Sequence, residues 1–235
     1  MDNQEKRTRV LGLRKNIPAD QILKNSIDVV ELLSEEFVSR GLIKEQSTDA
    51  VGKDAVSGEC DKSDGRKVLC FYPLTGEVDL RRLYDELLTA GAELYFPKTN
   101  PNDCSMEFYR VDSLKDFSEG QYGVMEPVYV DEGRKYQGNT GCFNVENTVN
   151  KESFTGDKER LEDNKDIIIC PGVIFDKNGN RGGFGKGYYD RYLMRYDLTK
   201  IAVAFEFQVY DEINTNEWDV PMDMLVTERN VYRWK

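Results

Sequence analysis

The sequence predicts an α/β protein with three layers, in which helices cover both faces of a mostly parallel, Rossmann-like central sheet. Short apolar runs alternate with helical patterns along the 235-residue chain. Several of these runs are apolar throughout, which is typical of strands buried on both faces. A glycine-rich stretch follows one such run. Because ligands of these folds gather at the carboxyl ends of strands, this stretch is the first candidate for a functional site.

In the first half of the chain, amphipathic helices alternate with short strands. Residues 19–40 carry apolar side chains at helical spacing, and Gly41 follows where a helix end favours glycine. Asp79 can cap a second helix, which ends at Gly91. The expected strands are 68–72, 92–98 and 105–111.

The second half is expected to continue the same sheet. Residues 166–175, "DIIICPGVIF", form a continuous apolar run that predicts one strand buried on both faces. A helix is expected to begin near Tyr188, and residues 201–206 predict a further strand. The stretches near 44–66 and 131–166 are polar, contain glycine and lack periodicity. We therefore expect a single domain over residues 1–235 with two polar insertions.

Composition excludes several classes of partner. The net charge of −11 argues against nucleic-acid or membrane-surface binding, because both need a basic face. The five cysteines are scattered and form no C-x-x-C pair, so neither a disulfide framework nor a zinc site is indicated. The N-terminal stretch lacks an apolar core of the signal-peptide type, and no run approaches the length of a membrane span. We expect a cytoplasmic monomer that binds small molecules.

The chain contains no histidine. Ser-His-Asp and Cys-His catalysis are therefore excluded, as are the histidine-rich sites of catalytic zinc and non-haem iron. Carboxylates, lysine, arginine, tyrosine, thiols and backbone amides remain for chemistry. That inventory suits magnesium and phosphate.

The glycine-rich stretch, residues 181–187, predicts a phosphate-binding loop. Its glycines permit positive φ and close backbone approach, the amides of the following helix start point outward, and Arg181 and Lys186 add positive charge. It is not a Walker A motif, which needs Ser or Thr at Gly187, and G-x-G-x-x-G fails at Tyr188. The alternative is a flexible surface turn, but Arg181, Lys186 and Asp190 within one short frame favour anion binding.

The segment "PGVIFDKNGNRGGFGKGYYDRYL" resembles the signature of the 5-formyltetrahydrofolate cyclo-ligase family, P-G-[VL]-x-F-D-x-x-G-x-R-[LI]-G-x-G-x-G-Y-Y-D. Only Gly182 departs from its fixed positions, because it replaces an aliphatic residue. The segments "FYPLTGEVDL", "YFPK", "MEFYRV", "GQYGVMEP" and "WDVPMDMLVTE" are similar to further parts of the family. The resemblance covers most of the chain outside the two insertions.

The resemblance implies an ATP-dependent and Mg²⁺-dependent conversion of 5-formyltetrahydrofolate to 5,10-methenyltetrahydrofolate with release of ADP and phosphate. Lys186 and Arg181 are the implied catalytic residues. The implied ATP contacts are Arg7, Arg181, Gly182, Gly183, Phe184, Gly185, Lys186, Gly187, Tyr188 and Tyr189. The implied substrate contacts are Tyr72, Glu77, Tyr122, Glu126 and Tyr188, and the implied magnesium ligands are Asp190 and Asp223.

The N-terminal segment of the family carries a lysine four residues before an arginine. The arginine falls on Arg7 here, but the lysine position is Asn3, so Lys6 or Arg14 is the candidate replacement. Other interpretations remain open at the level of sequence. Asp190 can simply stabilise the dipole of its helix from the first turn. Glu77 can be a solvated turn residue, and Tyr188 and Tyr189 can be core aromatics. A sugar-phosphate isomerase-like or deaminase-like enzyme and a non-catalytic folate or nucleotide sensor are the alternative functions.

Overall fold

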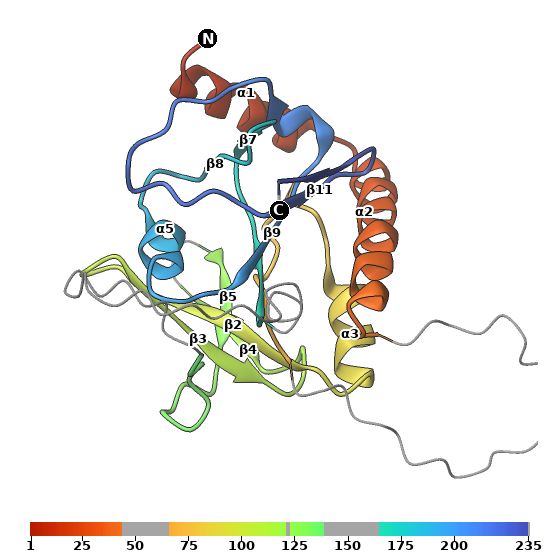
Figure 1. Cartoon of the computed structure of the whole chain (residues 1–235), viewed down its shortest axis with the longest axis vertical. Coiled ribbons are helices and arrows are strands. Elements are labelled where there is room, and N and C mark those ends of the chain that lie inside the picture. Colours follow the sequence, from red (N-terminus) through yellow and green to blue (C-terminus); the bar gives the residue numbers. More distant parts are fainter. Residues whose placement is uncertain (44–65, 121–122, 139–164, 235) are drawn as a thin grey trace, which may run out of the picture.

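The computed structural model describes residues 1–43, 66–120, 123–138 and 165–234. Most of both predicted insertions, residues 44–65 and 139–164, lies outside the described residues. Figure 1 shows a central sheet flanked by helices, with α1 (Asn3–Asn16) across one end.

A seven-stranded sheet forms the middle of the molecule, in the order β12-β11-β9-β6-β1-β2-β3. The five inner strands run parallel to one another, whereas β3 and β12 at the two edges are antiparallel to their neighbours. The bounds are β1 Lys67–Leu69, β2 Glu93–Asn100, β3 Ser105–Val111, β6 Ile167–Cys170, β9 Thr199–Val203, β11 Met224–Val226 and β12 Val231–Arg233. The predicted mostly parallel sheet is confirmed.

Both faces of this sheet are apolar, as the uniform apolar runs predict. Val68 and Ile169 lie in the core on one face, where α2 (Ala19–Ser39) and α3 (Arg81–Thr89) pack. Leu69 and Ile168 point to the other face, which α5 (Tyr188–Leu193) covers (Figure 1). Residues of one strand therefore alternate between two cores.

The expected single strand over residues 166–175 was wrong, because two strands of different sheets share this run. After β6 ends at Cys170, the chain leaves the main sheet and forms β7 (Ile174–Asp176) of a three-stranded sheet in the order β10-β7-β8. Pro171 has no backbone N–H to donate to a ladder. A Cβ at Gly172 would lie 2.4 Å from the ring of Phe175, so the turn between the strands is closely packed.

Helix α1 is an element that the sequence analysis missed. Asp2 and Glu5 form a capping box at its start, in which each side chain accepts a hydrogen bond from the other residue's backbone N–H. Only Val10 and Arg14 of the helix are buried. With so narrow a buried face, α1 shows little of the apolar periodicity that identifies α2 in the sequence.

Residues 131–138, which the sequence assigned to the second insertion, pack against the sheet. The backbone N–H of Tyr136 donates to the carbonyl of Phe108 in β3, and the Tyr136 side chain is 2% exposed. A small hairpin of β4 (Phe117–Glu119) and β5 (Met125–Pro127) precedes them. Within the described part of the chain, no helix is long and apolar enough to cross a membrane.

Candidate active site

The glycine loop joins the small sheet to α5. Strand β8 (Arg181–Gly182) pairs with β7, and the chain then turns through Gly185 and Gly187, whose φ angles of 85° and 67° favour glycine. Gly187 is the N-cap of α5. Phe184 and Lys186 are exposed on this loop. The Lys186 ammonium makes no hydrogen bond or ion pair with another described residue, so it is available to an anion.

The first turns of α1 lie against this loop. The guanidinium of Arg7 donates through Nε to the carbonyl of Gly183 at 2.9 Å. A Cβ built on Gly182 would lie 3.4 Å from Nη2 of the same guanidinium. Folding thus brings Arg7 to the loop that follows it by 176 positions in the sequence. The ATP contact that the family resemblance implies for Arg7 stays a prediction.

Arg181 is fixed beneath the loop. Its Nη2 forms an ion pair with Oδ1 of Asp190 at 3.0 Å, and its guanidinium lies 5.2 Å from the ring centre of Tyr189. The Arg181 side chain is 4% exposed and that of Asp190 is 18% exposed. Because a charge-assisted hydrogen bond is strong when partly buried, this pair sets the position of the first turn of α5 relative to the loop.

Gly182, the departure from the family pattern, has a physical reason. Ile174 of β7 is its cross-strand partner, and a Cβ on Gly182 would lie 2.6 Å from Cγ1 of Ile174. The volume of the usual aliphatic side chain is therefore supplied from the neighbouring strand. The absence of that side chain also leaves room for Arg7.

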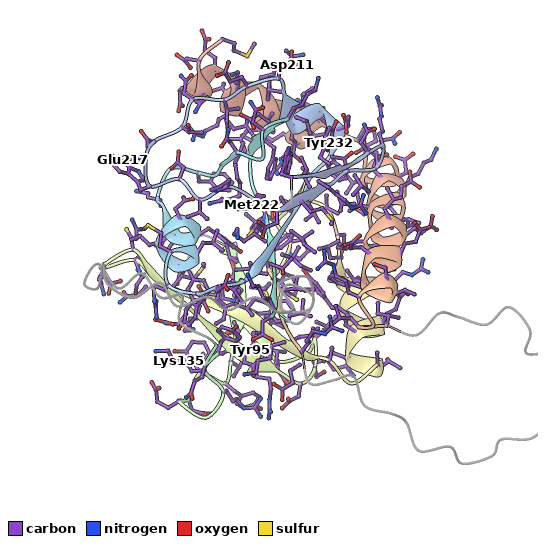
Figure 2. The ribbon with its side chains drawn as sticks, viewed as in Figure 1. Tyr95, Lys135, Asp211, Glu217, Met222 and Tyr232 are labelled. Carbon is purple, nitrogen blue, oxygen red and sulfur yellow. The ribbon has the colours of Figure 1, made fainter. Side chains whose placement is uncertain are left out.

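Asp223 lies at the start of β11, where it pairs with Lys200. Its Oδ2 accepts a hydrogen bond from the backbone N–H of Lys200 at 2.8 Å and lies 3.0 Å from the Lys200 ammonium. Met222, which directly precedes Asp223, lies near the centre of the molecule in Figure 2, whereas Asp211 and Glu217 of the preceding loop lie at its edge. Asp223 thus lies at the amino end of β11, whereas the glycine loop comes after the carboxyl end of β6.

The thiol of Cys170, at the end of β6, is fully buried. Burial raises the pKa of this thiol to about 12; the positive charges of Arg181 and Lys200 oppose that shift, and the carboxylates of Asp190 and Asp223 add to it. Magnesium often takes only one or two protein carboxylates, with phosphate oxygens and waters completing the shell. Among the described residues there is no cluster of three or more metal-binding side chains.

Glu77 is not a solvated turn residue, since it is only 7% exposed. Its Oε1 accepts from Nη1 of Arg14 at 3.1 Å, and its Oε2 accepts from the backbone N–H of Leu74 at 3.0 Å. Burial raises the pKa of the Glu77 carboxyl, and the charge of Arg14 together with the Leu74 hydrogen bond opposes that rise. Arg14 is thereby committed to Glu77 and does not replace the missing lysine at the phosphates.

The other predicted replacement for that lysine also lies elsewhere. The Lys6 ammonium donates to the carbonyl of Glu212 at 2.6 Å, and the amide of Asn3 donates to the carbonyl of Asn214 at 2.7 Å. Both side chains fasten α1 to the loop before β11. Arg7 is the α1 side chain that reaches the glycine loop in the described structure.

Tyr72 packs against the β4–β5 hairpin, and Glu126 is part of it. The ring of Tyr72 packs on Phe117 of β4 at 4.9 Å between ring centres. Glu126 of β5 is 3% exposed, and its Oε1 accepts from both the backbone N–H and the hydroxyl of Thr99, at 3.1 and 2.8 Å. Tyr122, the third implied substrate contact in this region, lies outside the described residues.

Tyr188 and Tyr189 are half-buried and pack against the core on the α5 face, so part of their role is structural. Sequence reasoning overlooked their neighbour Arg191. Its guanidinium donates to the carbonyl of Lys186 at 2.5 Å and to the carbonyl of Cys104 at 2.8 Å, which ties the glycine loop to the β2–β3 turn. The position of Arg191 directly after the last signature residue, Asp190, was the signal that could have identified it.

Comparisons with known proteins identify the family and the fold. The sequence pattern of the 5-formyltetrahydrofolate cyclo-ligase family matches residues 2–228. The 5-formyltetrahydrofolate cyclo-ligase of Mus musculus is 44% identical over 175 residues, which cover 70% of this chain and 74% of the relative. That of Escherichia coli K12 is 26% identical over 171 residues, covering 71% and 80%.

A solved structure with a similar fold is the Aquifex aeolicus 5,10-methenyltetrahydrofolate synthetase. It superposes with a TM-score of 0.66 at 32% identity and covers 98% of this chain and 91% of its own. A 5,10-methenyltetrahydrofolate synthetase from Mycoplasma pneumoniae, at 18% identity and a TM-score of 0.62, shares the fold, with coverage of 97% and 99%. The resemblance seen in the sequence is confirmed, and the chain belongs to the 5-formyltetrahydrofolate cyclo-ligase family of ligases.

Proposed function

We propose that the protein converts 5-formyltetrahydrofolate and ATP to 5,10-methenyltetrahydrofolate, ADP and phosphate, and that the reaction requires Mg²⁺. The observation that carries this proposal is the pairing of Arg7 with the glycine loop, beside an exposed Lys186, in a chain of this family. The loop supplies backbone amides and a cation at one point, which is the arrangement that a triphosphate needs.

The glycine loop and its basic neighbours would hold the ATP phosphates. The amides from Gly183 to Gly187 approach the phosphate oxygens, and the Lys186 ammonium neutralises charge on the transferring group. Arg7 contributes a second cation from α1. Arg181 adds positive charge beneath the loop, where Asp190 holds its guanidinium. Positioning and charge neutralisation are the main tasks of a protein in phosphoryl transfer.

The proposed chemistry has two bond-forming steps. The formyl oxygen attacks the γ-phosphorus, and the bond between this phosphorus and the β–γ bridging oxygen breaks. ADP departs, and the folate becomes an N5-iminium phosphate. N10 then adds to the activated carbon and loses its proton, and the carbon–oxygen bond breaks to release phosphate. An N-formyl oxygen leaves readily only after phosphorylation, which explains the need for ATP.

Asp190 and Asp223 are the proposed ligands of Mg²⁺, because the resemblance to the family implies this role for them and both carry the oxygen donors that this ion prefers. When bound, Mg²⁺ would neutralise charge on the phosphate oxygens. The Asp190 carboxylate pairs with Arg181, and the Asp223 carboxylate pairs with Lys200.

The folate would lie on the side of Glu77 and Tyr72. The Glu77 carboxylate is an acceptor of fixed orientation, suited to the N–H groups of a pterin. Tyr72 and Tyr188 offer rings for packing against the heterocycle, and Glu126 and Tyr122 complete the proposed contacts.

Phosphate release tests this proposal. The purified protein is mixed with Mg²⁺, ATP and 5-formyltetrahydrofolate, and phosphate and the absorbance of the methenyl product are recorded together. The proposal predicts that both rise only when both substrates are present. Folate binding without turnover would support a sensor instead, and the absence of ATP-dependent phosphate release from folded protein would reject the ligase reaction.

A further inference from the structure

Helix α1 presents two arginines on one face, seven residues apart and so about two turns from each other. Arg7 reaches the glycine loop through the carbonyl of Gly183 at 2.9 Å. Arg14 reaches the carbonyl of Gly172 at 2.6 Å and the carboxylate of Glu77 at 3.1 Å. The same helix therefore contacts the proposed nucleotide side and the proposed folate side.

The helix is held firmly between these two contacts. Val10 lies between the two arginines, is fully buried and packs in a small core with Val173, Ile174 and Ile213. Val173 and Ile174 belong to the segment that connects the end of β6 to the glycine loop. Because this core fixes the middle of α1 on that segment, its two arginines have defined positions relative to the loop.

The turn that carries Glu77 is moulded on Arg14. Gly76 has a φ of 82°, and a Cβ there would lie 2.9 Å from both Cβ and the carbonyl oxygen of Arg14. Arg14 and Glu77 are each 7% exposed, so water has little access to their charges. The two Glu77 oxygens are held by Arg14 and by the Leu74 N–H, which fixes the plane of the carboxylate.

We propose that Arg14 is a positioning residue that orients the Glu77 carboxylate for the folate and keeps it ionised. This inference rests on the proposed function, since it assigns a role to the arginine behind the proposed substrate contact. Arg14 is buried under the 74–77 turn and acts through Glu77, whereas Arg7 serves the nucleotide. Two arginines of one helix would then control two different substrates.

The charges of Arg14 and Glu77 stabilise each other in their buried position. Burial lowers the pKa of Arg14, and the charge of Glu77 opposes that change. Burial raises the pKa of the Tyr189 phenol, and the charge of Glu77 adds to that rise. Without Arg14 the Glu77 carboxylate would be buried with no counter-charge, and its pKa would rise further.

The test compares Arg14→Met, Arg7→Met and Arg9→Met in the full-length protein. Arg9 is an exposed arginine of α1 outside both contacts and is the matched control. We expect Arg14→Met to raise the KM for 5-formyltetrahydrofolate by about tenfold or more, because a hydrogen bond to a charged group is lost, with the KM for ATP changed less than about twofold. Arg7→Met should show the reverse, and Arg9→Met should match the wild type. Arg14→Lys should restore part of the folate KM.

The pH profile separates positioning from mere stability. We expect the acid limb of kcat/KM to move to higher pH in Arg14→Met, because Glu77 must be ionised to accept hydrogen bonds. If Arg14→Met does not fold, the double variant Arg14→Met/Glu77→Gln removes both buried charges, and it should fold and bind ATP while losing folate affinity. If the wild type turns over and Arg14→Met has an unchanged folate KM and an unchanged acid limb, this inference alone is overturned. Normal folate affinity in the double variant would overturn it as well. No turnover by the wild type would overturn the proposed function as well.

Discussion

The guanidinium of Arg181 and the carboxylate of Asp190 form a partly buried ion pair with a nitrogen–oxygen distance of 3.0 Å. This pair joins Arg181 of β8 to the first turn of α5. Any ion that binds Asp190 must share this carboxylate with Arg181. We therefore expect magnesium to bind an Asp190 carboxylate whose position is already fixed by Arg181.

Replacing either proposed magnesium ligand should raise the magnesium requirement. For Asp190→Asn and Asp223→Asn we expect the Mg²⁺ concentration that gives half-maximal turnover to rise about tenfold or more, because each variant removes a charged oxygen donor. Asp197→Asn is the control, since Asp197 is an exposed carboxylate that pairs with Lys165. A magnesium titration at saturating ATP makes the measurement, and an unchanged midpoint in Asp223→Asn would remove Asp223 from the site.

Lys186→Ala should lower kcat/KM by about 100-fold or more, because it removes a cation aimed at the transferring phosphoryl group. The fold should be unaffected, as the Lys186 ammonium is exposed and pairs with no described side chain. Lys177→Ala, which removes an exposed ion pair with Asp211, is the matched control and should retain wild-type kinetics. Near-normal kcat/KM in Lys186→Ala would rule out its proposed role.

Gly182 and Ile174 should behave as one packing unit. Gly182→Leu alone should cost about 1–3 kcal/mol of unfolding free energy, since its side chain would enter the space of Ile174. Adding Ile174→Ala should recover part of this loss, because the second change frees the volume that the leucine needs. Denaturant unfolding of both single variants and the double variant measures the coupling. Additive effects would show that the two residues do not compete for space.

Stability should fall in acid in part through Glu36. Burial alone raises the pKa of Glu36, but hydrogen bonds from Arg233 and Arg40 outweigh this effect and hold the pKa below the ordinary 4.5. A carboxyl with a lowered pKa in the folded state stabilises the fold above pH 4.5 and loses that contribution as the pH falls through the folded-state pKa. Nη2 of Arg233 lies 2.8 Å from Oε2 of Glu36, and this contact joins α2 to β12.

Thermal unfolding as a function of pH tests this contribution. Glu36→Gln should lower Tm by about 2–4 °C at neutral pH and show a shallower loss of stability in acid than the wild type. Glu35→Gln changes the neighbouring exposed carboxylate and should leave the profile unchanged. Equal acid sensitivity in wild type and Glu36→Gln would assign the effect to other carboxyl groups.

The sequence predicted the parts of the fold that depend on local pattern. Helix α2 was found because its apolar periodicity is strong, and β1, β2, β6 and β9 were found because their runs are apolar. Strand β11 was not predicted. Helix α1 escaped notice because it buries little, and the run over residues 166–175 hid a change of sheet at Pro171. Periodicity reports burial but does not tell which sheet a buried strand joins.

The candidate site shows the same limit. The glycine loop was predictable because its residues are consecutive and each has a known backbone preference. The pairing of Arg14 with Glu77 was not, because the two residues are 63 positions apart and only the packing of α1 brings them together. The reason for Gly182 likewise appeared only when Ile174 was seen opposite it.

The central claim, transfer of the γ-phosphoryl group to the formyl oxygen, is tested most directly by isotope transfer. 5-Formyltetrahydrofolate carrying ¹⁸O in its formyl group is turned over with unlabelled ATP, and the released phosphate is analysed by mass. We predict that each phosphate carries one ¹⁸O atom, because the formyl oxygen leaves on phosphorus. Unlabelled phosphate formed together with methenyl product would contradict this mechanism.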